Sequence, residues 1–94
     1  MLAFYLSLLE EEHHPLFTEF YTRYRGKLYA VALSILKNHH LAEEAVQETF
    51  LKVIRHFETF LKIFEKSRKE IGPWAVTIVK NTALDMRKKE ERSV

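Results

Sequence analysis

The scarcity of helix-breaking residues is the feature that most constrains how this chain folds. Only two glycines and two prolines occur among 94 residues, and strand-like alternation of apolar and polar residues is hard to find. Apolar residues instead recur at intervals of three and four, as they do in amphipathic helices. The sequence therefore predicts an all-α fold, a compact bundle of three to four helices, in a single domain over residues 1–94.

Four helices are expected, over about residues 2–11, 15–37, 40–57 and 73–89. Pro15 suits the first turn of the second helix, and Asn38 follows its end. Each of the last three helices has an apolar stripe that we expect to face the core. These stripes are Phe17, Phe20, Tyr21, Tyr24, Leu28, Val31 and Ile35; Ala42, Val46, Phe50, Val53 and Phe57; and Ala75, Ile78, Val79, Thr82 and Met86.

Residues 58–72 are the ambiguous segment. Phe57, Phe60, Leu61 and Phe64 could continue the third helix for two more turns. The pair Gly72 and Pro73, however, stops one element and starts another. We expect the helix to break within this segment, which then acts as a connector carrying aromatic residues and the cations Lys66, Arg68 and Lys69.

Several classes of protein are disfavoured by composition. The chain has no cysteine, which excludes a disulfide framework, a thiolate metal site and a cysteine nucleophile. The apolar N-terminal stretch lacks a basic leader and runs directly into Glu10, Glu11 and Glu12. No apolar run approaches the roughly 20 residues needed to cross a bilayer. We expect a soluble, cytoplasmic protein with no membrane partner.

Enzymatic chemistry has only the five histidines as support. His40 and Glu44 are four residues apart and could both face a metal ion, but two ligands do not make a site. The phosphate-loop, HExxH and nucleophile-elbow motifs do not occur in the sequence. We therefore expect no catalytic residue, no metal site and no cofactor, and we do not expect an enzyme.

Charge is distributed unevenly along the chain. Residues 1–50 carry four Lys or Arg against seven Asp or Glu, whereas residues 51–94 carry eleven against six. This asymmetry suggests a polyanionic partner for the basic second half. A solvated helical surface is the alternative explanation for any single cluster.

The third predicted helix has a second face, opposite its apolar stripe. Spacings of three and four bring together Glu44, Gln47, Glu48, Leu51 and Arg55. A leucine within a polar face is consistent with a contact to a partner protein. The alternative is an ordinary solvated surface with one scattered leucine.

The fourth predicted helix combines an aromatic residue, an amide and cations on its outer face. Trp74, Thr77, Asn81 and Lys88 share this face, flanked by Lys80 and Arg87. Single-stranded nucleic acid suits the combination, because bases stack on aromatic rings while cations follow the phosphates. The alternative for Trp74 alone is packing against a neighbouring helix.

Two segments resemble a known family. The run from Leu41 to Phe50, LAEEAVQETF, resembles region 2.2 of sigma-70-type transcription initiation factors, and the run from Trp74 to Asp85, WAVTIVKNTALD, resembles the tryptophan-led helix of regions 2.3 and 2.4. Residues 15–38 are similar to region 2.1. The resemblance is to the small extracytoplasmic-function (ECF) group and covers about residues 15–90.

The resemblance implies two binding partners. It places Glu44, Gln47, Glu48, Leu51 and Ile54 at the clamp helices of the β′ subunit of core RNA polymerase. It also implies that the last helix and the connector, residues 58–72, recognise and melt the promoter −10 element and hold its non-template strand. The DNA-binding residues expected on this basis are Lys66, Arg68, Lys69, Trp74, Thr77, Lys80, Asn81, Arg87 and Lys88. An anti-sigma factor is a further candidate partner.

Some positions depart from the family pattern. Leu41 stands where members usually have an aspartate, so we expect a frayed start of the region 2.2 helix. Thr77 replaces the usual arginine, which affects promoter preference. We also expect no region 4 domain for the −35 element within these 94 residues. The alternative function is a sigma-like helical module that binds polymerase or another protein without opening DNA.

Overall fold

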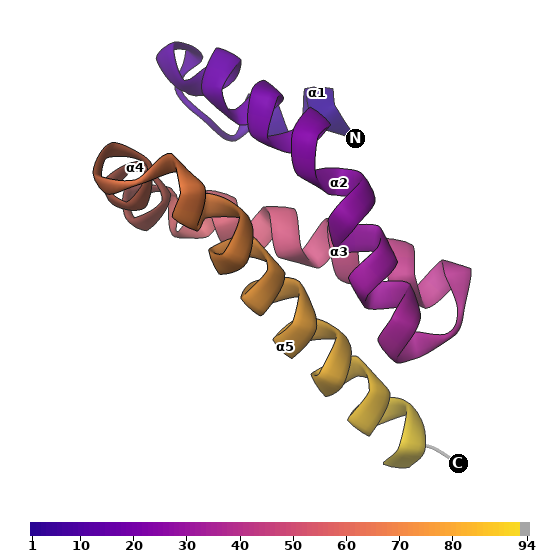
Figure 1. Ribbon diagram of the computed structural model, residues 1–94. Helices are drawn as coiled ribbons and strands as arrows, with labels where there is room; N and C mark the ends of the chain where they lie inside the picture. Colours follow the sequence, from indigo (N-terminus) through magenta and orange to yellow (C-terminus); the bar gives the residue numbers. More distant parts are fainter. Residues whose placement is uncertain (93–94) are drawn as a thin grey trace.

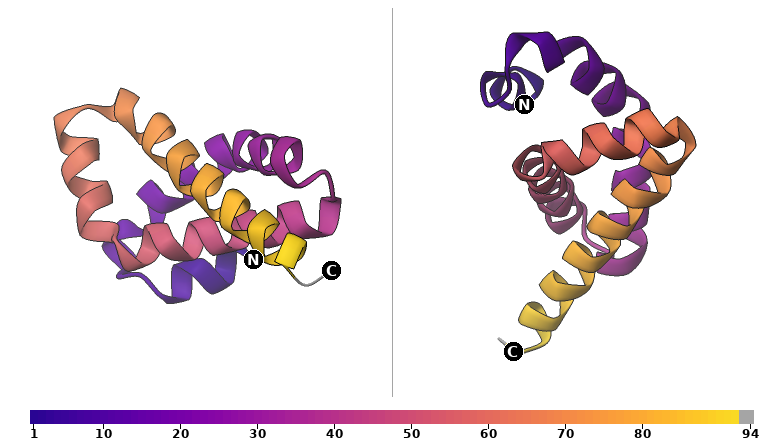
Figure 2. Two further views of the ribbon diagram at one scale, coloured as in Figure 1. Left: turned by 90° about the horizontal axis from the view of Figure 1, so that it is seen from below. Right: turned by 90° about the vertical axis from the view of Figure 1, so that its left-hand side faces the viewer.

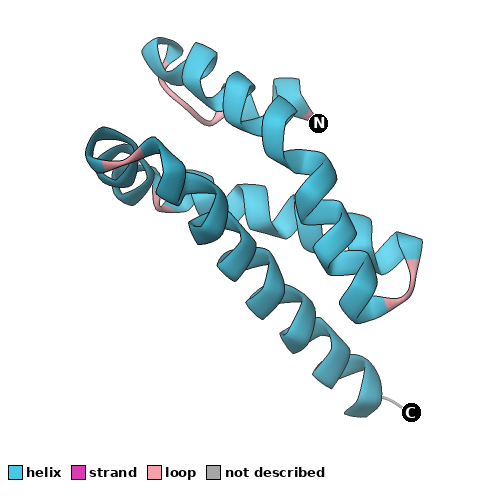
Figure 3. Ribbon diagram, in the orientation of Figure 1, coloured by secondary structure: helices cyan, strands magenta, loops and turns pink. Residues whose placement is uncertain are grey.

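The computed structural model describes residues 1–92, and residues 93 and 94 of the expected single domain lie outside that range. All secondary structure in residues 1–92 is helical (Figures 1 and 3), which confirms the all-α prediction. Within this described part of the chain there are five α-helices instead of three to four, with two short 3₁₀ turns. They are α1 (Leu2–Ser7), η1 (Glu11–His13), α2 (His14–Leu36), α3 (His39–Arg55), α4 (Phe57–Lys66), η2 (Arg68–Glu70) and α5 (Ile71–Arg92).

Helices α2, α3 and α5 form the body of the bundle, where each packs against the other two. Helix α1 lies across α2 and α3, while α4 leads from the end of α3 to the start of α5 (Figures 1 and 2). The C-terminal turns of α5 extend beyond the other helices (Figure 2, right). The basic second half of the chain therefore has a long exposed flank.

Aromatic rings fill the centre of the core. Phe50 is buried, and its ring centroid lies 4.9 Å from that of Tyr21, 5.5 Å from Tyr5 and 5.7 Å from Phe20. Tilted and edge-on pairs of this kind add about 0.5–1.5 kcal/mol each beyond the burial of their surface. The aromatic stripe of α2 thus meets α1 and α3 at one point.

The buried stripes differ in part from those expected. On α3, Ala45 and Thr49 are fully buried whereas Val46 is only half-buried. Small side chains let α3 approach α2 and α5 closely, and Thr49 remains satisfied because its hydroxyl donates to the carbonyl of Ala45 at 2.8 Å. On α5, Ala83 is buried whereas Ile78 and Met86 are half-buried. Periodicity alone favoured the larger apolar residues.

The turn between α2 and α3 explains why the first turn of α3 is stabilised. Lys37 adopts a left-handed conformation with φ of 53°, and its N–H donates to the Leu33 carbonyl, which ends α2. Asn38 then caps α3, accepting a hydrogen bond from the N–H of Leu41 at 2.9 Å. Such caps stabilise by about 0.5–2 kcal/mol. The expected frayed start is therefore wrong, because the cap comes from Asn38 and not from position 41.

The other boundaries also needed correction. Helix α1 ends at Ser7 and not near residue 11, and the segment expected to be a connector is mostly helix α4. The break after α3 falls at His56, which has φ of −114° and ψ of 37°. Gly72 lies inside the first turn of α5, where a Cβ would come within 2.9 Å of the Tyr24 ring. Glycine there permits close contact between α5 and α2.

Tyr5 on α1 gives a test of core burial. Burial, aided by the neighbouring Tyr21, raises the pKa of Tyr5 from 10.0 to about 12. Below pH 10 the phenol is neutral in both the folded and unfolded chains. Above it the unfolded chain ionises first, so stability is lost as pH rises from about 10 to 12, by ~2–3 kcal/mol. Urea unfolding at pH 9 and pH 11.5 should show a steeper decline for the parent than for Tyr5→Phe, and equal declines would contradict the prediction.

Candidate functional site

One face of α3 stays available for a partner. Glu44 and Gln47 are exposed on it, and Glu48 is partly exposed. Leu51 and Ile54 are half-buried, with part of each side chain packed against the core. The five residues predicted to bind polymerase thus lie along one helix, in an order that gives an acidic and amide-bearing surface beside apolar atoms.

The ion pair between Glu48 and Arg55 on this face can be broken at a small cost in free energy. The Glu48 carboxylate lies 3.4 Å from the Arg55 guanidinium, and the two side chains are 40% and 58% exposed. Exposed pairs of this kind contribute about 0–1 kcal/mol. Glu48 can therefore exchange Arg55 for a cation of a partner at little expense.

The outer face of α5 carries the predicted DNA-binding residues, with one correction. Thr77, Lys80, Asn81, Arg87 and Lys88 are exposed along the helix. Trp74 was expected to point away from the core, but it is half-buried and its ring lies 6.1 Å from that of Phe60. Packing against α4 fixes this ring, because much of the segment expected to act as a connector forms this helix.

The polar contacts on this face, one hydrogen bond and one ion pair, are local. The Thr77 hydroxyl donates to the Pro73 carbonyl at 3.0 Å, and Arg87 lies 3.9 Å from Glu91 one turn away. From Trp74 to Lys88 the helix rises by about 21 Å, at about 1.5 Å per residue. The residues therefore form a track along α5 and not a compact pocket, which suits an extended ligand.

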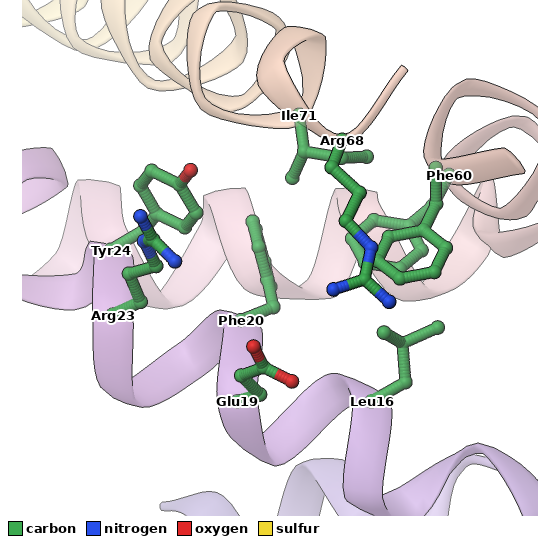
Figure 4. A pocket seen from close by; sticks show the side chains of 9 residues that line it. Leu16, Glu19, Phe20, Arg23, Tyr24, Phe60, Arg68 and Ile71 are labelled. Atoms are coloured by element: carbon green, nitrogen blue, oxygen red, sulfur yellow. The ribbon is translucent and has the colours of Figure 1, made fainter. Parts of the chain in front are cut away.

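One of the three connector cations points toward α2. Lys66, Arg68 and Lys69 are all exposed at the α4–η2 turn. The Arg68 guanidinium lies 4.5 Å from the centre of the Phe64 ring, a cation–π geometry. With Arg23 it lines a cavity of about 60 Å³ between α2 and α4 (Figure 4). Arg68 thus points toward α2 and not toward the track on α5.

Two residues at these surfaces were missed from the sequence. Arg23 faces the cavity opposite Arg68, with Glu19 and Phe20 between them (Figure 4). Lys52 donates from its Nζ to the Thr82 hydroxyl at 2.8 Å and so joins α3 to α5. In the sequence, Lys52 directly precedes Val53 of the expected apolar stripe, which places it at the edge of the buried side of α3. Helical spacing alone does not tell an interhelical lysine from a solvated one.

Residues 1–92 contain no cluster of three or more His, Cys, Asp or Glu side chains placed to hold a metal ion. Among the helices described there, none combines the length and apolarity required to cross a bilayer.

Comparison with known proteins gives a family and one relative. Residues 20–93 match the family model described as sigma-70 region 2. The ECF RNA polymerase sigma factor SigM of Bacillus subtilis (strain 168) is 29% identical over 76 residues, which cover 81% of this chain and 43% of that protein. The chain therefore spans less than half the length of this relative. No solved structure matches the chain.

Proposed function

This chain belongs to the sigma-70 region 2 family, and on that premise we propose that it binds core RNA polymerase and melts the promoter −10 element. The α3 face from Glu44 to Ile54 binds the β′ clamp helices. Regions 2.3 and 2.4, on α5, and the connector at α4 and η2 recognise the −10 element and hold its non-template strand. The observation that carries the proposal is the presence of Glu44 and Gln47, both exposed, and Glu48, partly exposed, on one helical face.

Charge supports the two assignments. The acidic side chains of α3 favour a basic partner helix, whereas the α5 track and the connector expose Lys66, Arg68, Lys69, Lys80, Arg87 and Lys88. Unpairing bases costs a few kcal/mol. Stacking on an aromatic ring returns about 1–3 kcal/mol per base, and the cations neutralise phosphates. Melting is thus driven by binding energy, and the proposed function requires no catalytic group.

The proposal is tested by two titrations of the parent chain. In the first, a purified β′ clamp-helix fragment should bind saturably. In the second, a single-stranded oligonucleotide with the −10 non-template sequence should bind with strong salt dependence. A plot of the logarithm of the binding constant against the logarithm of the salt concentration has a slope of roughly −0.7 per neutralised phosphate. We therefore expect a slope of about −4 if all six cations take part.

The outcomes separate the two candidate functions. Binding of the clamp-helix fragment with no salt-dependent binding of DNA would favour the helical module that contacts polymerase without opening promoters. The packing of Trp74 against Phe60 is the observation in favour of that alternative. A folded chain that binds neither ligand would contradict both functions.

A further inference from the structure

One lysine reaches from the helix proposed to bind polymerase to the helix proposed to bind DNA. Lys52 lies on α3 and is half-buried, and its Nζ donates a hydrogen bond to the Thr82 hydroxyl of α5 at 2.8 Å. Thr82 is only 3% exposed, and α3 packs directly against α5. A long, charged side chain is thus held in the seam between the two helices.

The direction of this side chain is not the one that helical spacing favours. Glu48 precedes Lys52 by four residues, the order in which a glutamate and a lysine attract each other along a helix. In the structure Glu48 pairs instead with Arg55, at 3.4 Å, and Lys52 extends to α5. The position of Lys52 therefore reflects the packing of two helices and not attraction within one of them.

The hydroxyl that accepts this bond is itself held in one orientation. Thr82 donates its proton to the carbonyl of Ile78, one turn earlier on α5, at 2.8 Å. The lysine ammonium can only donate, so a lone pair of the Thr82 Oγ1 faces Lys52. Together the two bonds specify the distance and the direction from which Lys52 meets α5.

Small apolar side chains contribute much of the buried surface of both helices. Ala45 of α3, and Ala75 and Ala83 of α5, are fully buried. Contacts of such residues are not directional, and they define the rotation of one helix on another through shape alone. The bond from Lys52 to Thr82 is directional, and its charged donor makes it stronger than a bond between neutral groups. It therefore favours one rotation of α5 about its own axis.

This bond lies beside both proposed binding surfaces. Lys52 follows Leu51 of the α3 face, and Thr82 follows Asn81 of the α5 track. A rotation of α5 about its axis would carry the exposed side chains of the track, such as Asn81 and Lys88, sideways relative to α3. The geometry set at Thr82 thus determines where the residues proposed to contact the −10 element lie.

We propose that Lys52 is a positioning residue, whose bond to Thr82 fixes the rotation of α5 on α3. When the α3 face is seated on polymerase, this bond holds the α5 track in line with the promoter strand that is to be opened. Lys52 itself contacts neither polymerase nor DNA. The inference rests on the proposed function, because it needs α3 to bind polymerase and α5 to bind DNA.

The test measures promoter opening by the 94-residue chain with core RNA polymerase, as permanganate reactivity of promoter thymines. Lys52→Met removes the donor and keeps the apolar stem, and Thr82→Val removes the acceptor at nearly constant volume. Each should lower the equilibrium constant for opening by about 10- to 100-fold, the scale of one hydrogen bond to a charged group. The double variant should be no worse than either single variant, because both changes remove the same bond.

Controls separate positioning from folding and from direct binding. Lys62→Met makes the same change of charge at an exposed position of α4, and Thr82→Ser keeps the hydroxyl. Both should open the promoter within about threefold of the parent. Clamp-fragment affinity and the salt slope of single-stranded DNA binding should stay at parent values in Lys52→Met and Thr82→Val. Urea unfolding identifies a temperature at which every variant is folded, and Lys52→Gln, with a shorter side chain, replaces Lys52→Met if that variant does not fold.

The remaining outcomes overturn the inference, each in its own way. Parent-like opening by folded Lys52→Met, or additive losses in the double variant, would show that the bond does not position α5. A salt slope smaller in magnitude by about 0.7 in Lys52→Met alone would make Lys52 a phosphate contact. Weaker clamp binding by Lys52→Met would place Lys52 in the polymerase interface. A parent that neither binds polymerase nor opens DNA would contradict the proposed function itself, whereas failure confined to these predictions leaves that function intact.

Discussion

Glu48→Lys should abolish measurable binding to the β′ clamp-helix fragment while the domain stays folded. The change removes an acceptor from the centre of the α3 face and places a cation before a partner that we expect to be basic. Losing one side of an interfacial charge pair costs about 2–5 kcal/mol. The free energy of unfolding should change by less than about 0.5 kcal/mol, because the Glu48–Arg55 pair is on the surface.

The same titration needs a variant that makes an equal change of charge elsewhere. Glu65→Lys does so at an exposed position of α4, and it should bind the fragment like the parent. Gln47→Ala should weaken binding without adding charge. Undiminished affinity of Glu48→Lys, with urea unfolding equal to that of the parent, would remove the α3 face from the polymerase interface.

Periodicity predicted the helices that carry the surfaces. The α3 face could be predicted because Glu44, Gln47 and Glu48 repeat at helical spacing, opposite a continuous apolar stripe. The same argument placed Thr77, Asn81 and Lys88 together on the last helix. Helical spacing therefore fixes which residues share a face, and Glu44, Gln47, Thr77, Asn81 and Lys88 are exposed on these two helices.

The breaks between helices could not be predicted in this way. Residues 57–66 form a helix of their own because the chain turns at His56, a residue with no strong turn preference. That break places Phe60 against Trp74 and turns Arg68 toward α2. The orientations of Trp74 and Arg68 depend on the angle between α4 and α5, which no local sequence pattern specifies.

The cap of α3 illustrates the same limit on a smaller scale. A family pattern drew attention to Leu41, whereas the side chain that accepts the hydrogen bond belongs to Asn38, three residues earlier. The two alternatives differ in where the helix begins. Spacing cannot decide this, because the apolar stripe of α3 first contributes a buried residue at Ala42.

Trp74→Ala should impair promoter opening more than it impairs association with polymerase. Loss of the ring removes about 1–3 kcal/mol of stacking on an unpaired base. The equilibrium constant for promoter opening should therefore fall by roughly 5- to 150-fold. The measurement is permanganate reactivity of promoter thymines at saturating polymerase, with clamp-fragment affinity determined in parallel.

Because Trp74 contacts Phe60, Trp74→Ala also removes packing between α5 and α4. A control variant must therefore separate the loss of packing from the loss of base stacking. Trp74→Phe keeps an aromatic ring in that contact and should retain most of the opening. A domain that unfolds would lose clamp binding and opening together, whereas a lost stacking surface affects opening alone. Unchanged thymine reactivity in a folded Trp74→Ala protein would mean that Trp74 serves the packing of the bundle, and base stacking would then have to be sought elsewhere on the α5 track.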